Sequence, residues 1–211
     1  MKSIILILCS ITVLITSCTQ SPAQASKTDK KVGGPCEGCE AIYEYGKKKL
    51  SSVDTLPDFF DKGPKLKVTG TIYKKDGKTP AKDVILYIYH TDQTGVYPNK
   101  GGETGWARRH GYIRGWIKTG ADGKYTFYTL RPASYPNSKN PQHIHPTIKE
   151  PGKSEYYIDE YQFADDPFLT PEQRKYCENR GGSGIKQTTQ SGNLQVFKRD
   201  IILGLNIPGY D

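Results

Sequence analysis

Long hydrophobic runs are almost absent from this 211-residue chain, in which hydrophobic residues make up 35%. The mean hydropathy is −0.65. The longest apolar stretch, Ile4 to Ile15, is too short for a usual transmembrane helix. Most of the chain is therefore expected to be a water-soluble domain, and its length suffices for one domain with a sizeable core.

The chain also lacks an arginine-rich stripe with interleaved aromatic residues, although its formal net charge is +8. That absence argues against a nucleic-acid partner. The basic balance by itself favours anionic substrates or lipid headgroups only weakly.

Cysteine is sparse, with five residues in the whole sequence. Cys9 and Cys18 belong to the N-terminal region, which leaves Cys36, Cys39 and Cys177 for the folded part. An exported chain favours disulfides, so Cys36 could pair with Cys39, or one of the two could reach Cys177. Unpaired thiols remain an alternative. A zinc site is less favoured because no second ligand pair accompanies the first.

The first 17 residues have the pattern of a secretory signal, with Lys2 as a positive start before the apolar run. The run ends in Ile15-Thr16-Ser17-Cys18, which resembles a bacterial lipobox. The resemblance implies that residues 1–17 are removed and that acylated Cys18 anchors the protein in a lipid bilayer. An exported lipoprotein of the outer membrane or cell envelope would result. The alternative is a plain signal peptide followed by a chance cysteine.

Residues 18–35 are rich in Ser, Gln, Lys, Thr and Gly, which predicts a flexible tether before a domain over residues 36–211. In that domain, short segments rich in β-branched and aromatic residues alternate with Asp-Gly and other turn signals. The pattern predicts an all-β fold, an antiparallel β-sandwich with one short helix and long loops. The predicted strands are residues 66–73, 84–90, 112–118, 125–130, 143–149, 156–163 and 194–203.

The short helix is expected to begin at Thr170-Pro171-Glu172-Gln173, which offers an N-cap, a proline at the first helical position and a capping-box glutamine. Gly181-Gly182 would end it. The segment from Glu40 to Leu50 is predicted as a short helix or an irregular arm. Pro98 to Arg109, rich in Gly and charge, is predicted as a loop that could cover a site.

Four side chains near the middle of the chain combine into a candidate metal site: Tyr97, Tyr135, His143 and His145. The two histidines are two positions apart on a predicted strand, so both imidazoles face one side. Each tyrosine lies in a loop just beyond a predicted strand, where site residues collect. A trivalent cation favours the ionised phenol, so this set suits Fe(III). Zinc more often recruits Cys, His or carboxylate, and Fe(II) oxygenases use two histidines and a carboxylate.

Most of the 15 tyrosines must serve in packing, and a lone His-x-His is common by chance. His143-Ile144-His145 followed by Glu150 also resembles half of a cupin metal motif. However, no glycine lies six residues before His143, and His90 and His110 are both upstream, so no later histidine supplies a fourth ligand. Glu150 lies in a Lys-Glu-Pro-Gly turn pattern. The cupin alternative is therefore disfavoured.

From about Leu66 to Leu203 the chain resembles the intradiol ring-cleavage dioxygenases of the protocatechuate and catechol class. The similarity lies in several short stretches that follow the family order, which is more specific than any single motif. These stretches are residues 68–72, 91–97, 119–127, 130–136, 141–145 and 199–203.

The resemblance implies a non-haem Fe(III) site with Tyr97, Tyr135, His143 and His145 as protein ligands. It implies that a small aromatic diol chelates the metal and that Tyr135 then leaves it and accepts a substrate proton, which makes Tyr135 catalytic as well. O2 would be inserted between the two hydroxyl-bearing carbons to give a cis,cis-muconate-type diacid. Iron would act as Lewis acid, template and electron relay.

Two positions depart from the family pattern. Asn140 stands where the family usually has an arginine that stabilises developing negative charge, and Glu160 falls at the place of a later glutamine. Arg114 or Arg131 would have to supply the missing catalytic guanidinium. These departures keep open an iron-binding dioxygenase that has lost turnover.

A second alternative comes from another class of protein. Residues 68–90 with Asp122-Gly123-Lys124-Tyr125 also resemble the transthyretin-like and carboxypeptidase-regulatory modules, which bind or brace and do not catalyse. Such a module has no need of paired tyrosines with His-x-His. The four candidate ligands are therefore the feature that discriminates between the two classes.

Overall fold

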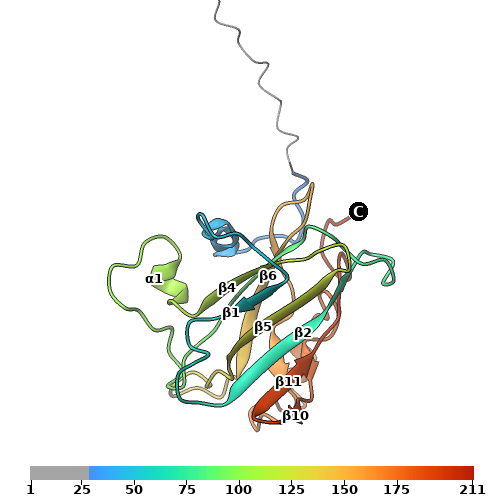
Figure 1. Cartoon of the computed structure of the whole chain (residues 1–211). Helices are drawn as coiled ribbons and strands as arrows, with labels where there is room; N and C mark the ends of the chain where they lie inside the picture. Colours follow the sequence, from blue (N-terminus) through green and yellow to red (C-terminus); the bar gives the residue numbers. More distant parts are fainter. Residues whose placement is uncertain (1–28) are drawn as a thin grey trace, which may run out of the picture.

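The computed structural model describes residues 29–211, in which two β-sheets pack on one another (Figure 1). The predicted signal peptide and Cys18 lie outside the described residues. The first sheet has the order β1-β5-β2-β11-β10, with β12 beside β2. Its strands are β1 Val53–Thr55, β2 Lys65–Tyr73, β5 Lys124–Leu130, β10 Thr189–Ser191, β11 Leu194–Lys198 and β12 Ile201–Ile202.

The second sheet has the order β4-β3-β6-β8-β9, with β7 beside β6. Its strands are β3 Ile85–Tyr89, β4 Arg114–Lys118, β6 His143–Lys149, β7 Tyr156–Tyr157, β8 Tyr161–Phe163 and β9 Ile185–Lys186. The predicted all-β sandwich is confirmed. Its central pairs, such as β2 with β5 and β3 with β6, are antiparallel, but β1, β11, β12 and β9 each join a neighbour in parallel. Long connections make such parallel neighbours possible.

The core between the sheets follows from the alternation of side chains along each strand. On β2, Leu66 and Val68 are buried against β3 residues such as Leu86. On β6, Ile144 and Ile148 enter the same core. The histidines of β6 therefore lie on the opposite, outer face of the second sheet, and this register places the candidate site.

A smaller apolar cluster covers part of that outer face. The 3-10 helix η1, Cys39–Tyr43, packs Ala41 and Ile42 against Tyr87 and Trp116. The indole Nε1 of Trp116 donates a hydrogen bond to the Ala41 carbonyl at 3.2 Å. The segment predicted as a short helix or arm is thus a short helix that docks on the sheet.

The disulfide joins Cys36 to Cys39 immediately before η1, which is the first of the pairings considered. Cys177 has no disulfide partner among the described residues.

The described end of the predicted tether, residues 29–35, packs against the domain. Val32 is buried, and its N–H donates to Ser154 Oγ at 3.0 Å. The N–H of Gly33 donates to the Pro208 carbonyl at 2.8 Å. The packed domain therefore begins before the expected boundary at Cys36.

The predicted helix after Thr170 is much shorter than expected. Only one 3-10 turn forms, η2 Gln173–Tyr176, and the chain is extended again at Cys177. The expected cap is present, since Thr170 Oγ1 accepts from the Gln173 N–H at 3.3 Å. No residue of the turn is buried, so no apolar face stabilises a longer helix.

Other differences concern short elements. The predicted strand 156–163 is divided into β7 and β8, and the predicted strand 194–203 into β11 and β12. The predicted 98–109 loop runs into a one-turn helix, α1 Ala107–His110. Within residues 29–211, no helix has the length and apolar character needed to cross a bilayer.

Candidate metal centre

The structure brings the four predicted ligands to one point. Tyr97 follows β3, Tyr135 follows β5, and His143 and His145 are the first and third residues of β6. The Tyr97 hydroxyl lies 2.8 Å from His145 Nε2. The Tyr135 hydroxyl lies 3.1 Å from His143 Nε2 and 3.3 Å from His145 Nε2. The two Nε2 atoms are 3.1 Å apart, and the two hydroxyls contact each other.

The two tyrosines meet because their loops are locked together. Asp92 Oδ1 accepts hydrogen bonds from the backbone of Thr94 at 2.8 Å and of Val96 at 3.3 Å, which forms a tight turn before Tyr97. Gly95 has a φ of 81°, and a Cβ there would lie 2.0 Å from the Ser134 carbonyl oxygen. Only glycine permits this approach. The turn chemistry of one loop thus sets its contact with the loop that carries Tyr135.

Hydrogen bonds on the far side of each imidazole fix its tautomer. His143 Nδ1 lies 2.6 Å from the Pro141 carbonyl oxygen, which can only accept, so Nδ1 carries the proton. His145 Nδ1 lies 2.9 Å from Glu160 Oε1. Both Nε2 lone pairs are therefore free and directed at the tyrosine hydroxyls. This is the arrangement that supports a metal-ligating histidine.

The electrostatics are set mainly by burial. Burial raises the pKa of the Tyr97 hydroxyl and that of the Tyr135 hydroxyl above the ordinary value, so both phenols are neutral without a cation. Burial also lowers the pKa of His143. For Glu160, burial pushes the pKa upward, but the hydrogen bond and charge of His145 outweigh it and lower the pKa to about 2. Glu160 is therefore an ionised carboxylate.

This donor set fits Fe(III). Two phenol oxygens and two imidazole nitrogens lie close enough to one another to share a cation, and phenolates favour the trivalent ion. Glu160, His143 and His145 also form a group whose ligand atoms lie within 4.8 Å of one another. However, Oε1 of Glu160 contacts the Nδ1 side of His145 and is 3.9 Å from His143 Nε2. Glu160 thus supports the ligand more directly than it could ligate.

The two predicted guanidiniums are engaged elsewhere. Arg114 Nη1 lies 2.6 Å from Glu44 Oε2. Arg131 pairs with Asp165 at 3.0 Å and donates to Gln142 Oε1 at 2.7 Å. None of these contacts involves a candidate metal ligand.

A cavity of about 210 Å³ lies in front of the donors and reveals residues that the sequence pattern did not identify. Its walls include three of the candidate ligands together with Glu37, Tyr89, Trp106, Arg109 and His110. Trp106 and Arg109 come from the Gly- and charge-rich segment after Tyr97, whose aromatic and basic content was the available signal. Arg109, not the residue at position 140, brings a guanidinium to the cavity, and it pairs with Glu37.

An aromatic stack holds His145 from the side. Tyr89 pairs with His145 in the register of β3 with β6, and their rings are 4.5 Å apart at 18°. The other face of the stack continues to His110, whose ring lies 3.8 Å from Tyr89 at 6°, and then to Trp106. His110 Nδ1 contacts the Tyr87 hydroxyl at 2.8 Å. The plane of the His145 ring is therefore fixed by packing as well as by Glu160.

The cupin alternative is wrong because Glu150 lies away from the histidines. It is buried and accepts hydrogen bonds from the hydroxyls of Tyr156 at 2.8 Å and Tyr210 at 3.0 Å. Glu150 therefore holds the C-terminal segment and is not a ligand.

The fold and the site together define an all-β protein of the type that carries paired tyrosine and histidine donors. The family model described as "Dioxygenase" matches residues 43–178. The chain belongs to the intradiol ring-cleavage dioxygenase family. This match is to dioxygenases and not to the transthyretin-like or carboxypeptidase-regulatory modules considered above.

Two curated relatives illustrate the similarity. Catechol 1,2-dioxygenase 1 of Acinetobacter lwoffii is 37% identical over 108 residues, which are 51% of this chain and 32% of that protein. The protocatechuate 3,4-dioxygenase beta chain of Burkholderia cepacia is 24% identical over 155 residues, which are 67% of this chain and 65% of that one. The matched part of the chain thus spans less than two thirds of either relative.

The fold recurs in solved structures. The dioxygenase domain of a dioxygenase carbohydrate-binding protein fusion from the cellulolytic bacterium Streptomyces sp. SirexAA-E has a TM-score of 0.56 at 23% identity. The comparison covers 76% of this chain and 94% of that chain. At this level of identity the likeness concerns the fold.

Proposed function

We propose that the protein is a non-haem Fe(III) dioxygenase that inserts O2 between the two hydroxyl-bearing carbons of a small catechol-type diol and yields a cis,cis-muconate-type diacid. The observation that carries the proposal is the convergence of two phenol oxygens and two imidazole Nε2 atoms within 3.3 Å of their neighbours. Membership in the intradiol family supports it.

In this proposal Tyr97, Tyr135, His143 and His145 hold the ion, and bound Fe(III) supplies the Lewis acidity and electron transfer that activate the diol toward O2. Tyr135 accepts a proton from the diol. Its hydroxyl belongs to a residue that lines the cavity. Because burial raises its pKa, its phenolate is a strong base once it is free of the metal.

The cavity also suggests which guanidinium serves the reaction. Arg109 shares the cavity with Tyr97 and Tyr135, whereas Arg114 and Arg131 are held by Glu44 and Asp165. We therefore favour Arg109 over the two arginines expected from the sequence as the cation nearest a bound diol.

A second candidate function is an iron-binding member of the family that has lost turnover. Two observations favour it. Asn140 is an exposed neutral residue where the family has an arginine, and Arg109 is already paired with Glu37. A site without a free cation would bind a diol but would stabilise developing negative charge poorly.

The test uses the full chain purified with iron. Charge transfer from tyrosinate to Fe(III) should give a red-brown colour, and oxygen uptake is followed with catechol, protocatechuate and hydroxyquinol, with product analysis. Uptake with ring-opened product supports the dioxygenase, and a colour change on diol binding without uptake supports the second candidate. A colourless, iron-free protein would overturn both.

Variants test the ligand assignment in the same experiment. Tyr97→Phe and His145→Ala should each remove the colour. Tyr176→Phe is the matched control, since Tyr176 is 73% exposed and outside the centre. If both site variants stay coloured, the ligand set is wrong.

The location in the cell is a separate proposal, an exported lipoprotein acylated at Cys18. It is tested by metabolic labelling of the producing bacterium with a clickable fatty acid. The wild-type chain should carry the label and Cys18→Ala should not. A labelled Cys18→Ala chain, or an unlabelled wild type, would contradict the proposal.

A further inference from the structure

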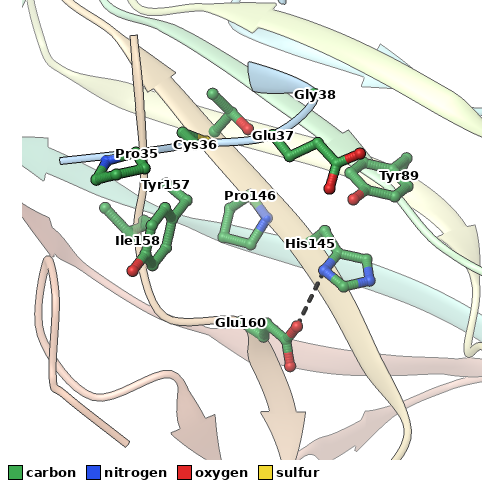
Figure 2. Close-up of a pocket in the computed structure, with 11 residues that line it drawn as sticks. Pro35, Cys36, Glu37, Gly38, Tyr89, His145, Pro146, Tyr157, Ile158 and Glu160 are labelled. Carbon is green, nitrogen blue, oxygen red and sulfur yellow. Dashed lines mark ion pairs between the residues drawn. The ribbon is translucent and has the colours of Figure 1, made fainter. Parts of the chain in front are cut away.

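The space beside the metal centre is larger than one diol ring requires. A second cavity of about 220 Å³ adjoins the first and shares Glu37, Tyr89 and His145 with it (Figure 2). A cavity of about 150 Å³ already accommodates a benzene ring. The two cavities together therefore have room for a ring and a substituent.

The groove continues beyond this point. A third cavity of about 230 Å³ shares Tyr157, Ile158 and Glu160 with the second and reaches Cys177. The three cavities thus form one groove that runs along the outer face of the second sheet, from the metal donors past β7. A ring bound at the donors would direct one of its substituents into this groove.

The segment before η1 forms one wall of the groove. The Cys36–Cys39 disulfide closes a short loop whose Glu37 side chain lines both of the first two cavities. Gly38 follows with a φ of 81°, and a Cβ there would lie 2.8 Å from His110 Nε2. This close contact seats the loop on the aromatic stack beside the donors.

The groove is acidic although the whole chain has a formal net charge of +8. Its walls carry the carboxylates of Glu37, Glu160, Asp159 and Glu178. In Figure 2 the carboxylates of Glu37 and Glu160 lie on either side of the His145 ring. Of the described residues that line the three cavities, Arg109 is the one lysine or arginine.

The pairing of these charges leaves Glu37 available to a ligand. The side chains of Arg109 and Glu37 are 63% and 71% exposed, so their ion pair is screened by water and can exchange partners. At the far end, Arg180 pairs with Glu178 at 2.7 Å but is buried behind the Tyr157 ring, 3.9 Å from its centre. A ligand in the groove therefore meets carboxylates and aromatic faces, both of which attract cations.

We infer that this site takes catechols with an extended ring substituent that ends in a hydrogen-bond donor, above all an ammonium group, and that Glu37 selects it against a carboxylate. This inference rests on the proposed function and names its substrate class. It gives the disulfide loop a role in specificity.

The experiment compares three diols matched in length on the iron-loaded full chain. Dopamine ends in an ammonium group, 3-(3,4-dihydroxyphenyl)propionate ends in a carboxylate, and 4-ethylcatechol is neutral. Binding is read from the shift of the tyrosinate charge-transfer band, and turnover from oxygen uptake. Dopamine should bind about tenfold more tightly than the propionate at low salt, and 0.5 M salt should narrow the difference because it screens exposed charges.

Two variants should shift this preference in opposite directions. Glu37→Gln removes the selecting charge and releases Arg109, so the ratio should fall to unity or reverse. Arg109→Gln releases Glu37, so the ratio should rise. Glu40→Gln is the control, because Glu40 is exposed just after the disulfide loop and lines none of the three cavities, and the ratio should not change.

The outcomes separate the two levels of the argument. If no diol, including unsubstituted catechol, alters the spectrum, the proposed function fails. If catechol binds but dopamine and the propionate bind equally, or the propionate binds more tightly, the inference is overturned while the proposed function stands. A misfolded Glu37→Gln chain would leave Arg109→Gln to decide, since an unchanged ratio in that variant also contradicts selection by Glu37.

Discussion

Glu160 Oε1 lies 2.9 Å from Nδ1 of His145, and the opposite nitrogen of the same ring lies 2.8 Å from the Tyr97 hydroxyl. The carboxylate therefore holds the imidazole from behind while the ring presents Nε2 to the metal donors. A carboxylate behind a histidine ligand fixes its tautomer and makes it a better donor.

Removing this support should weaken iron binding. Glu160→Ala is expected to lower the affinity for iron about 10- to 100-fold, while Glu160→Gln should lower it less, because an amide oxygen still accepts from Nδ1. Competition with a chelator measures the affinity. Glu172→Ala, an exposed glutamate outside the site, is the control. Equal affinity of Glu160→Ala and wild type would show that Glu160 has no supporting role.

Iron binding should depend steeply on pH. Burial raises the pKa of both site tyrosines, so both phenol protons must leave when the ligands bind a metal. The apparent affinity should fall about 100-fold for each pH unit of acidification, as expected for two released protons. Tyr135→Phe retains one phenol and should show about a tenfold change per unit. The measurement is chelator competition between pH 8 and 6, corrected for the chelator, and a flat profile would exclude phenolate ligation.

The site could be predicted from the sequence to the extent that its residues occur in local motifs. Tyr97 and Tyr135 lie beside turn signals, and His143 and His145 share a face through the period of a strand. The structure shows their donor atoms together. The pairing of Glu160 with His145 Nδ1 depends on the register of β6 with β8, which sequence periodicity does not specify.

The fold was predictable in its long strands and less so in its short elements. β2 and β5 have strong alternation and match the expected ranges closely. By contrast, β9 and β10 are two and three residues long, too short for a periodic signal. The helix after Thr170 had good capping residues, but a cap cannot sustain a helix that buries no apolar face.

Buried His110 should make the fold sensitive to mild acid. Burial lowers its pKa to about 4, whereas the unfolded chain titrates near 6.5. Between these values the unfolded state binds a proton that the folded state does not, so stability falls as the pH decreases from about 6.5 to 4. Below pH 4 this group contributes no further loss.

The variant that tests this is His110→Gln, whose amide does not titrate. Urea unfolding of the iron-free chain at pH 7, 6 and 5 should give a shallower loss of stability than in wild type. The difference in slope should approach about 1.4 kcal/mol per pH unit near pH 5. A residual slope is expected because burial also lowers the pKa of His90. Identical slopes would show that His110 does not titrate as its burial requires.

The Cys36–Cys39 disulfide should contribute to stability and to the shape of the groove. In the chain-entropy account, a bridge across so short a loop stabilises the fold by about 2 kcal/mol. Cys36→Ser with Cys39→Ser should therefore lower the free energy of unfolding by about that amount or more, since Cys39 is buried and a serine hydroxyl there must find a new partner.

The consequences for binding distinguish the loop from a merely stabilising clamp. Because Glu37 lies between the two cysteines, the double variant should weaken the binding of dopamine more than that of unsubstituted catechol. Cys177→Ser controls for the change of residue type, since Cys177 has no disulfide partner among the described residues. An equal weakening of both diols would mean that the bridge stabilises the whole site. A selective loss for dopamine would place the effect in the loop, because the metal donors come from other segments.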